Sequence, residues 1–129
     1  MTEQEKEEII SYRIKKAYST IEEVEVHIEN QFWTTAINRL YYACFYAVSA
    51  LLLKNDINTQ SHSGTRQMFG LHFIKTEKIS KELGKFYSEI FDMRHVGDYD
   101  DFVDFSKDDI HRLEWFAESA IGFQPVKLL

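Results

Sequence analysis

Arg94, Asp98 and Tyr99 are the residues whose types and spacing most clearly suggest chemistry, within the segment RHVGDYDDF at residues 94–102. A guanidinium offers paired N–H donors to a phosphate, and a carboxylate can orient that guanidinium or accept a proton. The segment could therefore hold a phosphate group. A simpler alternative is that Arg94 only stabilises the end of a helix, because a cation there gains a few tenths to about 1 kcal/mol from the helix dipole.

The element expected to present this segment is a helix from Ser80 to about Val96. Gly97 is suited to end it in a left-handed conformation, so we expect Asp98 and Tyr99 to lie just past the helix end. Its apolar residues recur at helical spacing near one face, together with Met93 or Arg94. These residues are Leu83, Phe86, Tyr87, Ile90 and Phe91.

The rest of the chain also reads as helical, which predicts an all-α fold. Apolar residues at alternating spacings of four and three predict a helix over residues 3–29. A second helix begins after Asn30 and becomes almost entirely apolar over residues 40–53, LYYACFYAVSALLL, so we expect a buried central helix. This run is shorter than the roughly 20 residues that cross a bilayer, and charged residues bracket it, so we expect no membrane insertion.

Two further helices are expected around polar segments. Residues 55–61 form a connection, and Ser61 is placed to cap a short helix that continues to about Ile74. Ser106, with Asp109 three residues later, resembles a capping box for a last helix from Lys107 to about Ile121. Gly122 and Pro125 would end this helix, which is expected to bury Ile110, Leu113, Trp115 or Phe116, Ala117 and Ala120.

Length and composition favour one domain over residues 1–129 in a reducing, cytoplasmic setting. The chain has 44% hydrophobic residues, a single cysteine and an acidic first segment that lacks the features of a signal peptide. The formal net charge of −6 argues against a broad basic surface for nucleic acid. A local site remains open, because cations outnumber acids in the middle of the chain at Arg66, Lys75, Lys78, Lys81 and Lys85.

We expect no structural metal and no cofactor. His27, His72 and His111 lack the spacing of metal ligands, and one cysteine cannot complete a zinc site. The six aspartates between residues 98 and 109 lack the glycine and closing glutamate of a calcium loop. Phosphate-binding loops, dinucleotide fingerprints and hydrolase triads are absent from the sequence.

Arg39 and His62 are the other polar residues that need an explanation. Arg39 precedes the apolar run, where its stem could pack while its head reaches water, or where it could enter a buried ion pair. His62 follows the predicted cap Ser61, and its ring could hydrogen-bond a backbone group or the central helix. For both residues a structural role is the simpler interpretation.

Three segments together resemble the HEPN domain: RLYYACFYAVSALLL at 39–53, His-x-Gly at His62, and Arg-x-x-x-Asp-Tyr beginning at Arg94. The resemblance covers about residues 10–121 and implies an up-and-down bundle of four to five helices with one short extra helix. It also implies a homodimer in which two copies of the Arg motif face one cleft. Arg94 would then contact the scissile phosphate of RNA, Asp98 would orient Arg94 or the substrate, and Tyr99 would line the cleft.

The same resemblance implies either a metal-independent endoribonuclease or an RNA-binding protein, with members that act as toxins beside a minimal nucleotidyltransferase antitoxin. The family's strongest nuclease signature is an arginine followed after four to six residues by histidine, whereas positions 99–101 here are Tyr, Asp and Asp. His95 is adjacent to Arg94 and would point about 100° away on a helix. The alternative hypothesis is therefore a non-catalytic nucleotide-binding or protein-interaction subunit.

Overall fold

The structure is a computed structural model that describes residues 1–99, 105–111 and 113, with the backbone alone for residues 97–99. Every regular element in these residues is helical, so the predicted all-α fold is confirmed. The elements are α1 (Glu3–Glu29), α2 (Trp33–Lys54), α3 (His62–Phe69), the π-helix η1 (Gly70–Ile74) and α4 (Lys81–Tyr99).

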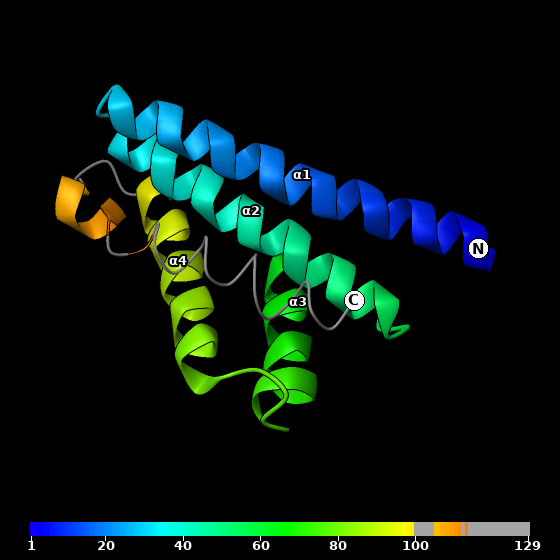
Figure 1. Cartoon of the computed structure of the whole chain (residues 1–129). Coiled ribbons are helices and arrows are strands. Elements are labelled where there is room, and N and C mark those ends of the chain that lie inside the picture. The colour runs from blue at the N-terminus through cyan, green and yellow to red at the C-terminus, as the bar shows by residue number, and fades with distance from the viewer. Residues whose placement is uncertain (100–104, 112, 114–129) are drawn as a thin grey trace.

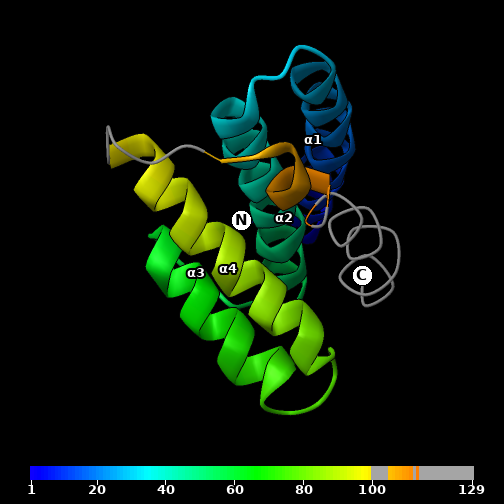
Figure 2. The ribbon, with the colours of Figure 1, turned by 90° about the vertical axis from the view of Figure 1, so that its left-hand side faces the viewer.

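The helices form two antiparallel pairs (Figures 1 and 2). The first pair is α1 and α2, and the second pair is the continuous α3–η1 segment and α4, which crosses the first pair. Helix α2 contacts α1, α3 and α4 and is the central element. It therefore carries the side chains that α1, α3 and α4 pack against.

The apolar composition of α2 explains its central position. Thirteen residues of this helix are buried, including Leu40, Tyr41 and Leu51 at 0% exposure. Burying a large apolar side chain stabilises the fold by about 1.5–3 kcal/mol, so a helix that is apolar on every side must be covered on several sides. By length and hydropathy α2 could also cross a membrane, but 67% of its apolar window is buried inside the protein, as expected of a core helix. Its single cysteine, Cys44, is buried as well.

Helix α1 has both predicted ends. Thr2 and Glu5 form a capping box at its start, where Thr2 Oγ1 accepts the Glu5 N–H at 3.1 Å. At its end the Phe32 N–H donates to His27 O at 2.8 Å and the Gln31 N–H to Ile28 O at 3.0 Å, which is the Schellman arrangement. Gln31 has φ 61°, so a non-glycine residue occupies the left-handed position of the turn into α2.

Ser61 caps α3 as predicted, because its Oγ accepts the Gly64 N–H at 2.9 Å. The helix does not stop at Phe69, since Gly70 keeps right-handed helical angles and the chain continues into η1. The Lys75 N–H then donates to Gly70 O at 2.8 Å, a bond that spans five residues. The predicted helical segment to Ile74 is therefore confirmed, with a widened last turn.

Helix α4 differs from the prediction at its C-terminal end. The sequence predicts that Gly97 terminates this helix, with Asp98 and Tyr99 just past its end, but the helix continues through Gly97 to Tyr99. A glycine inside a helix costs about 1 kcal/mol relative to alanine, which neighbouring residues can offset, so glycine permits termination without enforcing it. At the other end Ser80 Oγ accepts the Leu83 N–H at 3.3 Å, which supports the predicted start near Ser80.

Residues 105–111 and 113 return the chain to the core. The predicted capping box is present, because Asp109 Oδ2 accepts the Ser106 N–H at 3.0 Å and Ser106 Oγ accepts the Asp109 N–H at 3.3 Å. Ile110 and Leu113 are fully buried. The predicted continuation to Ile121, with its buried residues and its end at Gly122 and Pro125, lies outside the described residues.

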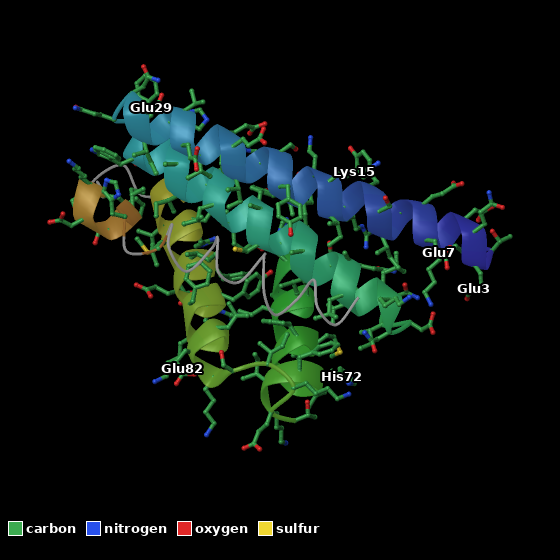
Figure 3. All side chains as sticks on the ribbon, in the orientation of Figure 1. Glu3, Glu7, Lys15, Glu29, His72 and Glu82 are labelled. Carbon is green, nitrogen blue, oxygen red and sulfur yellow. The ribbon has the colours of Figure 1, made fainter. Side chains whose placement is uncertain are left out.

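Replacing Gln31 by glycine should stabilise the protein. A side chain in the left-handed region is strained, and glycine relieves this strain, so we expect the free energy of unfolding to rise by roughly 0.5–1 kcal/mol. Denaturant unfolding measures the change. Lys15→Gly within α1, where Lys15 points away from the helices (Figure 3), should instead lower stability by about 1 kcal/mol. Equal destabilisation by both substitutions would contradict the strain at Gln31.

Candidate functional site

Arg94 lies on α4 with its guanidinium against α2. Its Nη1 donates to Tyr42 Oη at 3.3 Å, and its Cζ lies 5.1 Å from the Tyr41 ring centroid and 5.6 Å from that of Tyr42. A guanidinium within about 6 Å of an aromatic ring is attracted to the ring face. Arg94 is therefore held on two adjacent tyrosines of the central helix, and it remains partly exposed.

His62, the first residue of α3, contacts the same two tyrosines. Its Nδ1 is 2.7 Å from Tyr41 Oη, and its ring lies 4.5 Å from the Phe45 ring and 5.7 Å from the Tyr42 ring, centroid to centroid. Of the two predicted partners for this ring, a backbone group or the central helix, the structure shows the central helix. We call Arg94, Tyr41, Tyr42, Phe45 and His62 the Arg94–His62 cluster; it joins α2, α3 and α4.

Burial and charge fix the protonation states in this cluster. Burial raises the pKa of Tyr41 to about 12, so its phenol keeps its proton. Burial, together with the nearby Arg94 charge, lowers the pKa of His62 below its ordinary value. The cluster therefore presents one fixed cation beside an imidazole that is neutral at pH 7.

The Tyr41–His62 hydrogen bond is compatible with both tautomers of the neutral imidazole, because a phenol can donate or accept. When the phenol donates to Nδ1, Nε2 carries the ring proton; when Nδ1–H donates to the phenol, Nε2 offers a lone pair. His62 can thus give or accept a proton at Nε2 while Tyr41 holds its ring in place. The arrangement can stabilise negative charge and transfer a proton.

Arg39 lies at the edge of the cluster. Its Nε donates to Glu23 Oε2 of α1 at 2.9 Å, and its Cζ is 5.5 Å from the Tyr42 ring centroid. The Arg39 side chain is 25% exposed and that of Glu23 is 49% exposed. The guanidinium thus lies near an aromatic ring and forms a partly exposed ion pair, an outcome between the two predicted alternatives of a head in water and a buried ion pair.

Of the three site residues predicted from the sequence, only Arg94 has side-chain contacts that the structure describes. Arg94 is placed in a defined set of contacts, whereas Asp98 and Tyr99 lie in the last turn of α4 and their side chains lie outside the described residues. Positions 94 and 98 are one turn apart, so they share a face of the helix backbone. Within the described part of the chain, no three His, Cys, Asp or Glu side chains are grouped as a metal site would require.

Sequence reasoning did not place Tyr41, Tyr42 and His62 beside Arg94. These residues are distant in sequence, and an aromatic run on a central helix is more often core than site. A signal was available in two neighbouring tyrosines: their phenols bring polar groups into an otherwise apolar run. Each phenol has a polar partner in the structure, His62 for Tyr41 and Arg94 for Tyr42.

Comparison with known proteins places these residues in a family context. The family model of the HEPN domain matches residues 10–126. A UPF0332 protein of Thermotoga maritima is 41% identical over 92% of this chain and 88% of its own length. Two proteins of Methanocaldococcus jannaschii, each named "Putative toxin", are 37% and 32% identical over 78% and 71% of this chain and over 68% and 69% of their own lengths.

The pKa of His62 predicts a specific dependence of stability on pH. The unfolded chain binds a proton at His62 near pH 6.5, whereas the native protein binds it only at lower pH. Between these two pKa values the unfolded state binds more protons, so the His62 contribution lowers the free energy of unfolding as pH falls through this window. At pH values above 6.5, and again at pH values below the native pKa of His62, the free energy of unfolding no longer changes with pH on account of His62.

Denaturant unfolding of the wild type and of His62→Gln between pH 8 and pH 5 isolates this contribution. We expect stability to fall less steeply with acidification in the variant. The matched control is His72→Gln, since His72 is an exposed residue of η1 at the far end of the second helical pair (Figure 3). If wild type and His62→Gln have parallel pH profiles, the environment assigned to His62 is wrong.

Proposed function

Because the chain belongs to the HEPN domain family, we propose that it binds RNA and cleaves it as a metal-independent endoribonuclease, with Arg94 contacting the scissile phosphate. The observation that supports this most directly is the Arg94–His62 cluster. A guanidinium oriented by Tyr42 can stabilise charge on a phosphate, and a neutral imidazole oriented by Tyr41 can accept a proton, which are two functions useful for RNA cleavage.

The proposed reaction uses the 2′-hydroxyl of RNA as nucleophile. The 2′ oxygen forms a bond to phosphorus, its proton passes to His62 Nε2, and the bond from phosphorus to the 5′ oxygen of the next nucleotide breaks. A water molecule protonates the departing 5′ oxygen, and the hydroxide that remains takes the proton from His62 Nε2, which restores the neutral imidazole. The products are a 2′,3′-cyclic phosphate and a 5′-hydroxyl, and Arg94 stabilises the negative charge that builds up on the phosphoryl oxygens.

His62 could replace the histidine that the family's nuclease signature has after its arginine and that the Arg94 motif lacks. Positions 99–101 hold no histidine, but His62 contacts Tyr41 and Tyr42, the same two tyrosines that hold Arg94. In this proposal His62 takes the proton-transfer role from another helix. Asp98 is proposed to orient Arg94 or the substrate, and Tyr99 to line the cleft.

We propose that the active form is a homodimer in which two Arg94 motifs share one cleft, and that the protein is the toxin of a toxin–antitoxin pair with a minimal nucleotidyltransferase. The two relatives from M. jannaschii that are named "Putative toxin" support the toxin part of this proposal. A cytoplasmic location follows from an RNA substrate and agrees with a chain that has a single cysteine.

A second candidate is a non-catalytic subunit that binds a nucleotide or another protein. It is favoured by the inward position of Arg94, whose contacts with Tyr41 and Tyr42 also stabilise the packing of α4 on α2. The net charge of −6 favours it too, since RNA binding would then depend on a local site. In this case Arg94 would affect stability and leave RNA intact.

Replacing Arg94 by alanine separates the two candidates. With purified protein and single-stranded RNA in excess chelator, we expect the wild type to cleave and Arg94→Ala to be slower by about 100-fold or more, because one charged donor to the phosphate is lost. The 5′ fragments should carry a cyclic phosphate, which mass spectrometry detects. Arg94→Lys should recover only part of the rate, because lysine keeps the charge without the paired donors.

Lys15→Ala is the matched control for this experiment, since Lys15 is an exposed cation of α1 that points away from the helices (Figure 3). It should cleave like the wild type. Equal activity of wild type and Arg94→Ala would identify a contaminating nuclease, and RNA that stays intact with both would favour the non-catalytic candidate. Thermal unfolding of each variant shows whether a lower rate reflects lost fold.

The toxin proposal makes a separate prediction in cells. Induced expression of the chain should arrest growth, and Arg94→Ala at the same expression level should restore growth, because arrest depends on RNA cleavage. Growth curves with immunoblots of the expressed protein measure both quantities. Arrest that persists in a stably expressed Arg94→Ala protein would show that toxicity does not come from the cluster.

A further inference from the structure

A cavity of about 250 Å³ lies where α1, α2 and the start of α3 meet. Its walls combine apolar side chains with a cation, hydroxyls and an imidazole. They include Arg13, Phe45, Ser49, Leu53, Ile57 and His62. No acidic side chain lines the cavity in the described part of the chain. A cavity with a cation and without a carboxylate is suited to an anionic ligand.

Arg13 is the cation of this cavity. It is half-buried, and its Nη1 donates to Ser49 O of α2 at 3.2 Å. None of the ion pairs within the described residues includes Arg13. A guanidinium has five N–H donors and is costly to desolvate without a counter-charge, and burial lowers the pKa of Arg13 accordingly. An anion in the cavity would offset this cost.

His62 connects the cavity to the Arg94–His62 cluster. Its ring lines the cavity and also contacts Tyr41 and Tyr42, the two tyrosines that hold Arg94. Phe45 likewise belongs to the cluster and to the cavity wall. A ligand in the cavity would therefore lie directly beside the group proposed to transfer the proton.

We propose that this cavity is a second phosphate subsite for RNA, in which Arg13 binds the phosphate one nucleotide away from the phosphate at Arg94. The inference rests on the proposed function, because that function places RNA at Arg94. The ribose between the two phosphates then lies at His62, and the apolar wall formed by Leu53 and Ile57 packs against the nucleotide. The proposed order of groups, Arg94, His62 and Arg13, then corresponds to the order phosphate, ribose hydroxyl and phosphate along a ribonucleotide chain.

A ribonucleoside that carries phosphates on both its 3′ and 5′ oxygens is the direct probe of this subsite. Isothermal titration should show that it binds the wild type at least about tenfold more tightly than inorganic phosphate, because two charged contacts form instead of one. Arg13→Met keeps the apolar stem and removes the charge, so it should weaken binding of the bisphosphate about tenfold or more while binding of inorganic phosphate at Arg94 persists.

Lys15→Met is the matched control, since Lys15 is an exposed cation two residues away on α1 and points away from the helices (Figure 3). It should leave the affinity for the bisphosphate unchanged. Arg13→Lys serves as a second variant if Arg13→Met unfolds, because lysine retains the charge and should give an intermediate affinity. Equal affinities of wild type and a folded Arg13 variant would overturn the inference.

These experiments distinguish a failure of the Arg13 subsite from a failure of the nuclease proposal. If RNA stays intact but the bisphosphate binds in an Arg13-dependent manner, the subsite stands and the nuclease proposal is wrong. If RNA is cleaved in an Arg94-dependent manner but Arg13 variants bind and cleave like the wild type, the subsite alone is wrong. Competition by a single-stranded oligoribonucleotide, which should displace the bisphosphate, assigns the subsite to RNA; bisphosphate that stays bound would contradict an RNA subsite.

Discussion

The contact of Tyr41, on α2, with both α3 and α4 is the interaction on which the rest of the site depends. This side chain is fully buried on the central helix, its phenol meets His62 of α3 at 2.7 Å, and its ring lies beneath the Arg94 guanidinium of α4. A buried phenol is stabilised by a polar partner, and a half-buried guanidinium is stabilised by a ring face. Tyr41, on a helix of the first pair, thereby fixes the positions of His62 and Arg94, which lie on the two helices of the second pair.

Much of the fold could be predicted from sequence because its signals are local. Caps at Ser61 and Ser106 and the regular apolar spacing of α1 act through neighbouring residues, and the structure has them where they were predicted. The end of α4 could not be predicted in this way. Gly97 is compatible with either a left-handed turn or another helical residue, and its neighbours in the folded chain decide which is adopted.

In the candidate site, too, local patterns could be predicted from the sequence, whereas contacts between helices could not. Arg94 was identifiable from its motif, but its contacts with Tyr41 and Tyr42 depend on how α4 crosses α2, which no local pattern encodes. The sequence does not distinguish Arg13, because an arginine on a long amphipathic helix is normally part of a solvated face. Only the packing of α1 against α2 brings Arg13 to Ser49 and into a cavity beside His62.

Because Cys44 is buried in the core, the reactivity of its thiol reports how often the helices around α2 separate. The thiol is 4% exposed within α2, burial raises its pKa, and the sequence contains no second cysteine. A thiolate is the form that reacts with alkylating reagents, so modification requires the helices around α2 to separate first. The rate of alkylation of the unmutated protein therefore counts excursions in which the core, and with it the cluster on Tyr41, comes apart.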